Sequence, residues 1–124
     1  MTVLGQQLIS LVRAHAAEIP DFIYTSPFKD DNEYGACVYV HKGRASCLIG
    51  RALFDAGLID ASLSDGLNHS PIMSVIDDLN LKLDPEERRW LRNVQNYQDT
   101  RNSWGTAVAW ADRDALALTK QERG

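Results

Sequence analysis

The amino-acid sequence predicts an α+β fold dominated by helices, with about five helices and one small two-stranded β-hairpin. Apolar residues recur at steps of three and four along most of the chain, which is the spacing of amphipathic helices. Proline or a polar residue that can cap a helix precedes several of these stretches. Only one clear segment, CVYVH, has the β-branched and aromatic composition of a strand.

The first predicted helix occupies residues 1–19. Its apolar face is formed by Leu4, Leu8, Leu11, His15 and Ile19. Pro20 ends the pattern because proline cannot continue a helical hydrogen-bond ladder. Since His15 lies on the apolar face, we expect it to be a hydrogen-bonded core residue rather than a metal ligand.

Residues 20–45 are predicted to form a loop and the hairpin. The strand CVYVH, residues 37–41, lies between Gly35 and Gly43, two residues that favour turns. A shorter apolar piece, residues 22–24, precedes it. We expect these two segments to pair with one another.

The helical core is predicted to extend over residues 46–119. Ser46 can cap a helix whose apolar residues reach Ala56, and Gly57 suits its left-handed end. Residues 59–71 are expected to form a short helical turn and a loop.

Three further helix starts follow in this core. Ser70 before Pro71 opens a short helix, and Asp84 before Pro85 opens a longer one, since proline is favoured in the first turn. Ser103 can cap the last helix. The final residues, 120–124, are expected to fray into solvent.

The composition fits one globular domain that covers residues 1–124. Apolar residues make up 44% of the chain and charged residues 24%, and the formal net charge is −4. An acidic chain has no overall attraction to phosphate backbones, so nucleic acid is not the expected partner. No apolar stretch approaches the roughly twenty residues of a membrane span, and the start MTVLGQQLIS lacks the order of a signal peptide. We therefore expect a cytoplasmic protein that does not enter a membrane.

Cys47 is the residue on which an enzymatic alternative depends. In the cytoplasm Cys37 and Cys47 are expected to be thiols, with a disulfide bond between them as the alternative. A thiol at a helix start can have a lowered pKa. His41 could then act as a general base, which would make the protein a cysteine-dependent hydrolase or transferase. The neighbouring Leu48 and Ile49 favour the other interpretation, that Cys47 is buried as a packing residue. We predict burial.

The sequence gives little support for a metal or another cofactor. Cys37, His41, Cys47 and His69 are the candidate ligands, but no two of them have the close spacing of zinc sites. No cofactor is predicted.

Arg88, Arg89 and Arg92 form a basic side of the helix that starts at Pro85, and such a side could hold an acidic partner. Asp84 lies four residues before Arg88, and Glu86 three residues before Arg89. Because such pairs attract one another on a helix, we expect local charge compensation and a solvated face.

The segment from Gln95 to Asp114 is rich in aromatic residues and predicts a protein-binding surface. Trp104 falls on the apolar stripe of the last helix, whereas Trp110 lies about a third of a turn away from it. Either the buried face of this helix is unusually wide and Trp110 packs in the core, or Trp110 contacts a partner. Tryptophan, tyrosine and arginine are common anchors of protein interfaces, so Tyr97, Arg101 and Trp110 are the candidate contact residues. Self-association through the last helix is a further possibility.

Two segments, residues 37–58 and 93–111, resemble small uncharacterised proteins of actinobacteria and their bacteriophages. The positions that carry the resemblance are Tyr39, Gly43, Ser46, Cys47, Gly50, Gln95, Gln98, Asp99, Trp104 and Gly105. The resemblance implies a cytoplasmic accessory protein and brings no established activity. It also implies that the two clusters form one unit, in which polar side chains of the later helix bond to the helix start near Cys47.

Taken together, these observations predict a non-catalytic accessory protein that acts by binding another protein. With the resemblance, a phage-encoded modulator of a host factor is the expected type. The alternative remains a cysteine-dependent enzyme with Cys47 as nucleophile and His41 as base.

Overall fold

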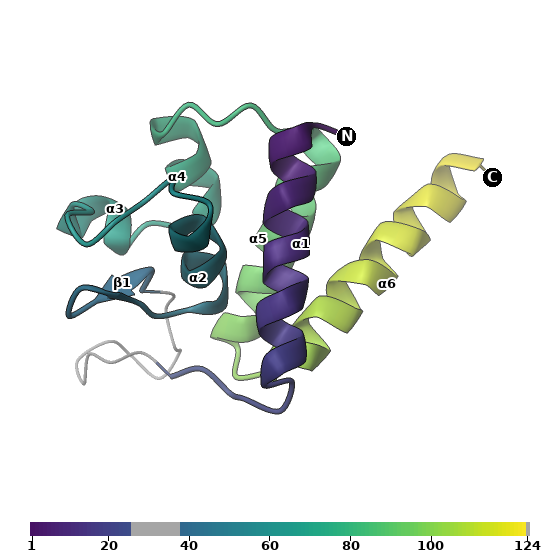
Figure 1. Ribbon diagram of the computed structural model, residues 1–124. Coiled ribbons are helices and arrows are strands. Elements are labelled where there is room, and N and C mark those ends of the chain that lie inside the picture. The colour runs from purple at the N-terminus through teal and green to yellow at the C-terminus, as the bar shows by residue number, and fades with distance from the viewer. Residues whose placement is uncertain (26–37, 124) are drawn as a thin grey trace.

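The computed structural model describes residues 1–25 and 38–123 (Figure 1). It confirms the predicted fold class, because these residues form six helices and a two-stranded antiparallel hairpin. The elements are α1 (Val3–Glu18), β1 (Val40–His41), β2 (Arg44–Ala45), α2 (Leu48–Asp55), α3 (Asp65–Asn68), α4 (Ile72–Asp78), α5 (Pro85–Asp99) and α6 (Trp104–Arg123). The sixth helix is the short α3, which lies where the sequence predicts a helical turn.

Helix α1 buries a face that is rotated from the predicted one. Its buried residues are Gly5, Leu8, Ile9, Val12 and Ala16. Of the predicted stripe only Leu8 belongs to this set, and Ile19 is 40% exposed. His15 is half-buried and its Nε2 lies 2.6 Å from Asp55 Oδ2 on α2, which confirms a hydrogen-bonded histidine.

The start of α1 is joined to the start of α5 through one buried carboxyl group. Glu87 is fully buried, and its oxygens accept hydrogen bonds from the Thr2 amide (3.0 Å), the Thr2 hydroxyl (2.8 Å) and the Asp84 amide (2.8 Å). The Thr2 hydroxyl oxygen in turn accepts a hydrogen bond of 2.8 Å from the Gly5 amide. These bonds satisfy amides that a helix start leaves without intrahelical partners.

The hairpin forms with a partner strand that differs from the predicted one. Strands β1 and β2 pair in antiparallel register around a two-residue turn of Lys42 and Gly43. Both turn residues have positive φ, 51° and 76°, as a type I′ turn requires. Because this turn has only two residues, it places β2 directly beside β1. The strand therefore pairs with the segment that follows it in the chain.

The segment predicted to pair with that strand lies elsewhere. Ile23 forms an isolated bridge with Ser103, and Phe22 accepts a hydrogen bond from the Trp104 amide at 2.9 Å. The prediction of a hairpin between residues 22–24 and 37–41 is therefore wrong. The early loop is instead fastened to the start of α6.

Gly50 lets the first turn of α2 cross directly over the strand segment. A Cβ atom at this position would lie 2.4 Å from the Tyr39 carbonyl oxygen. Only glycine permits so close an approach of two backbones. The predicted cap is displaced by one residue, since Cys47 rather than Ser46 is the N-cap of α2.

The core lies between α1, α2, α4, α5 and α6, with the most extensive contacts between α5 and α6 and between α1 and α2. Its largest fully buried apolar side chains are Leu8, Tyr39, Leu48, Ile49, Leu53, Ile72, Ile76, Leu91 and Trp104. Figure 1 shows that α6 diverges from the other helices towards its C-terminal end. Across the described ranges, no helix has both the length and the apolar character needed to cross a membrane.

Candidate functional site

The predicted contact residues Tyr97 and Trp110 form one aromatic cluster on α5 and α6. Their rings meet edge to face, with centroids 5.3 Å apart and an interplanar angle of 80°. Trp104 is fully buried, whereas Trp110 is 37% exposed. The offset of about a third of a turn between these two tryptophans therefore separates a buried side chain from a partly exposed one.

A charged pair holds this cluster in place. The Tyr97 hydroxyl donates a hydrogen bond of 2.5 Å to Asp114 Oδ2, and this bond raises the pKa of Tyr97 above its ordinary value. The guanidinium of Arg113 lies over the Trp110 ring, 5.4 Å from its centroid. Arg113 also approaches Asp114 at 3.9 Å. We call Tyr97, Trp110, Arg113 and Asp114 the aromatic surface.

Arg113 and Asp114 were not among the predicted site residues, although the sequence contains a signal for them. They follow Trp110 by three and four residues, the spacing of neighbours on a helix surface. The cation over the tryptophan therefore comes from α6 itself.

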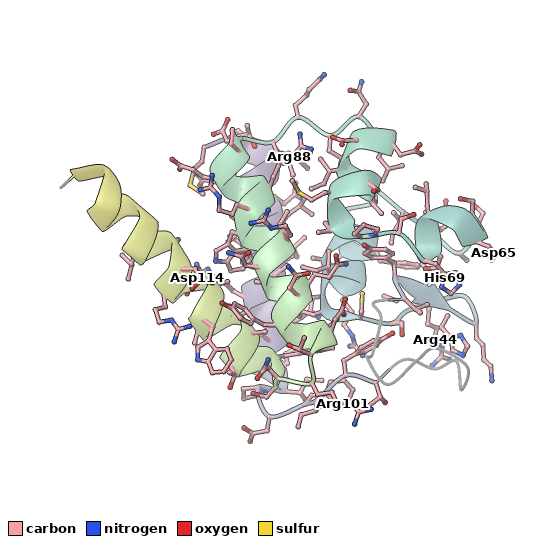
Figure 2. The ribbon with its side chains drawn as sticks, turned by 180° about the vertical axis from the view of Figure 1, so that it is seen from behind. Arg44, Asp65, His69, Arg88, Arg101 and Asp114 are labelled. Atoms are coloured by element: carbon pink, nitrogen blue, oxygen red, sulfur yellow. The ribbon has the colours of Figure 1, made fainter. Side chains whose placement is uncertain are left out.

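The predicted contact residue Arg101 lies just beyond the end of α5. It is exposed, it has a left-handed backbone (φ 67°), and its amide bonds to the Gln98 carbonyl at 3.1 Å. Figure 2 shows Arg101 at the end of α5 opposite to Arg88, with Asp114 partway along α6.

Cys47 is fully buried, as predicted, but it is not a thiol. Its sulfur is part of a disulfide bond, so the expectation that Cys47 is a thiol is wrong. The Sγ atom lies 3.3 Å from the Gly50 amide, from which it accepts a hydrogen bond at the helix start. Cys37, the other cysteine of the chain, lies outside the described residues. A disulfide sulfur has no proton to lose, so the thiolate chemistry of the enzymatic alternative requires prior reduction.

His41, the proposed base, is half-buried in β1 and pairs with Arg44 in the hairpin register. His69 is the C-cap residue of α3. Within residues 1–25 and 38–123, no group of three or more His, Cys, Asp or Glu side chains is arranged to hold a metal ion.

The two clusters of the resemblance do form one bonded unit. The Gln98 Oε1 atom accepts a hydrogen bond of 2.8 Å from the Leu48 amide in the first turn of α2, which confirms the predicted link. Gln95 does the same for α4, since its Oε1 accepts from the Ile72 amide at 2.8 Å. Its Nε2 donates to the Tyr39 hydroxyl at 2.7 Å. All these side chains are buried, so the unit holds helix starts together rather than offering groups to a ligand.

The buried polar side chains described above form hydrogen bonds within the protein, whereas Trp110 is partly exposed. We therefore take the aromatic surface as the candidate functional site. No protein-family model, curated protein or solved structure matches this chain.

Proposed function

We propose that this chain is a non-catalytic protein that binds another protein through its aromatic surface. The observation that carries the proposal is that Trp110 is 37% exposed while its ring contacts both Tyr97 and the guanidinium of Arg113. Large side chains that are already ordered lose little conformational entropy on binding, so they contribute more of their contact energy to affinity. Trp, Tyr and Arg are also the residue types that most often dominate interface energies.

The charges of the aromatic surface interact with one another, which leaves its aromatic rings as the main contact for a protein partner. Asp114 accepts from Tyr97 and lies near Arg113, so these charges are largely satisfied within the surface itself. A partner therefore gains chiefly by covering the exposed part of the Trp110 ring. A host protein of actinobacterial origin is the partner type that the sequence resemblance favours.

The test compares wild type with Trp110→Ala in a pull-down from an actinobacterial lysate, followed by measurement of Kd with the purified captured protein. Val3→Ala is the matched control, because Val3 is an apolar residue that is 88% exposed at the start of α1. We expect Trp110→Ala to weaken binding by about thirtyfold or more and Val3→Ala to leave it unchanged. Circular dichroism checks that both variants remain folded.

Two results would reject the proposal. One is the absence of any protein retained by wild type, and the other is equal affinity of wild type and Trp110→Ala. Analytical ultracentrifugation separates a further case: a wild-type dimer that Trp110→Ala dissociates would assign this surface to self-association instead.

A further inference from the structure

A second surface, on another side of α5, has the chemistry of a binding groove. It is a shallow groove of about 310 Å³ between α4, the segment before α5 and the first turns of α5. Its lining residues are Met73, Leu83, Pro85, Arg88, Arg89 and Arg92. We call these residues the arginine groove.

The arginines of this groove are not compensated in the way that the sequence suggests. Arg88 pairs with Asp77 of α4 at 2.6 Å, and Asp84 pairs with the N-terminal amine at 3.2 Å. The predicted pair between Asp84 and Arg88 and that between Glu86 and Arg89 are absent from the described part of the chain. Arg89 and Arg92 have no ion pair within that part.

The groove is distinct from the aromatic surface. At about 100° per residue, Arg92 and Tyr97 are about 140° apart around the α5 axis. Figure 2 shows Arg88 at the start of α5, far from Arg101 at its other end. A ligand of the groove can therefore be tested separately from the function proposed above.

We propose that the arginine groove binds a short acidic segment of a protein, with an apolar side chain between its carboxylates. Arg89 and Arg92 offer planar guanidinium groups, which match carboxylates in bidentate hydrogen bonds. The groove also has apolar walls, formed by Met73, Leu83 and Pro85. An apolar side chain of the ligand can pack against them. A fully polar anion would leave those walls without a partner.

The surrounding charges favour an acidic peptide over a nucleic acid. Asp84 and Glu86 line the neighbouring groove that shares Arg89, and Asp77 lies 2.6 Å from Arg88. A phosphate backbone that continued beyond the arginine groove would meet these carboxylates, and the net charge of the chain is −4. A short segment avoids this repulsion because its charges end with the groove.

The test measures the fluorescence anisotropy of a labelled peptide, Glu-Glu-Leu-Leu-Glu-Glu, with the full chain at low and at physiological salt. We expect binding that weakens with salt, and a loss of about tenfold or more in the double variant Arg89→Ala/Arg92→Ala. The control Lys42→Asn/Arg44→Ala removes the same number of charges from the exposed hairpin. It is expected to bind like wild type, since asparagine also tolerates the positive φ at position 42. Trp110→Ala is likewise expected to retain binding.

Three further probes decide the chemistry. A glutamine version of the peptide, or one with serine in place of leucine, is expected to bind at least tenfold more weakly. Equal binding of either version would overturn the proposal, as would equal effects of the two double variants. A single-stranded oligonucleotide that bound more tightly than the peptide and depended on Arg89 and Arg92 would overturn it in favour of a nucleic-acid site.

Discussion

Glu87 on α5 accepts hydrogen bonds from both the amide and the hydroxyl of Thr2, a residue 85 positions earlier in the chain. The same carboxyl group also accepts a hydrogen bond from the Asp84 amide at the start of α5. One side chain thus forms hydrogen bonds at the N-termini of both helices. These bonds join the N-terminal end of α1 to that of α5. Gly5 makes the approach possible, because a Cβ at that position would lie 2.1 Å from the Glu87 carboxyl atoms.

Replacing Glu87 with glutamine is expected to lower the free energy of unfolding by about 2 kcal/mol. The amide side chain has one acceptor oxygen, so its NH₂ group must face a backbone or hydroxyl donor. Urea unfolding followed by circular dichroism measures the loss. Glu86→Gln is the matched control, because Glu86 is exposed in the same turn, and its loss should stay below about 1 kcal/mol. Equal losses in the two variants would contradict a specific role for Glu87.

Gln98→Ala is expected to destabilise the protein by about 2 kcal/mol and to speed hydrogen exchange at the Leu48 amide. This substitution leaves a buried donor at the start of α2 without an acceptor. Asn96→Ala, on an exposed position of the same helix, should change stability by less than about 1 kcal/mol. Unaltered exchange at Leu48 in Gln98→Ala would show that another group satisfies this amide.

Cys47 is expected to give no reaction with a thiol reagent in the unreduced protein, even in denaturant, because its sulfur is in a disulfide bond. After reduction, the free energy of unfolding should fall by about 2 to 5 kcal/mol. Thiol titration with and without reductant, combined with urea unfolding, tests both points. A thiol in the unreduced native protein that reacted rapidly near neutral pH would instead support the enzymatic alternative with Cys47 as nucleophile.

Stability is expected to fall as the pH rises above about 10, and Tyr39 is one cause. Burial raises the pKa of Tyr39 well above its ordinary value of 10.0, since the interior penalises the phenolate. The unfolded chain therefore loses this proton first, and the folded state becomes less stable until the folded pKa is reached. One such group contributes a slope of about 1.4 kcal/mol per pH unit.

Urea unfolding between pH 9 and pH 11.5 measures this slope, and Tyr39→Phe isolates it. The variant is less stable throughout, because Gln95 and the Ser70 carbonyl lose their partner. Its stability should nevertheless fall less steeply with pH than that of wild type. Parallel curves for the two proteins would show that Tyr39 does not ionise on unfolding.

Local signals in the sequence are sufficient to predict the overall fold class and, to within one residue, the starts of α2, α4 and α5. The cap of α4, like that of α2, lies one residue later than predicted, at Pro71 instead of Ser70. Asp84 and Pro85 mark the start of α5, and a rotation of 100° per residue places Trp104 on the buried stripe of α6 and Trp110 about a third of a turn away from it. These predictions depend on residues within one or two turns. The link between Gln98 and the start of α2 came from the resemblance, not from spacing.

The errors concern contacts between segments that are distant in the chain or choices that composition alone leaves open. No local sequence pattern predicts the pairing of Ile23 with Ser103, because the two residues are far apart in the chain. The turn at Lys42 and Gly43, in contrast, is a local signal for the hairpin that forms. The state of Cys47 was predicted from an expected compartment rather than from geometry. Ion pairs were predicted within α5, but Arg88 reaches α4 instead.

The absence of space at Gly50 also limits how this sequence can vary. Alanine, the smallest alternative, would displace the first turn of α2 away from the Tyr39 carbonyl. The same turn is also hydrogen-bonded to the sulfur of Cys47. A saturation library at position 50 should consequently return glycine almost alone. That outcome is expected even from a selection for soluble expression, with no assay of binding at all.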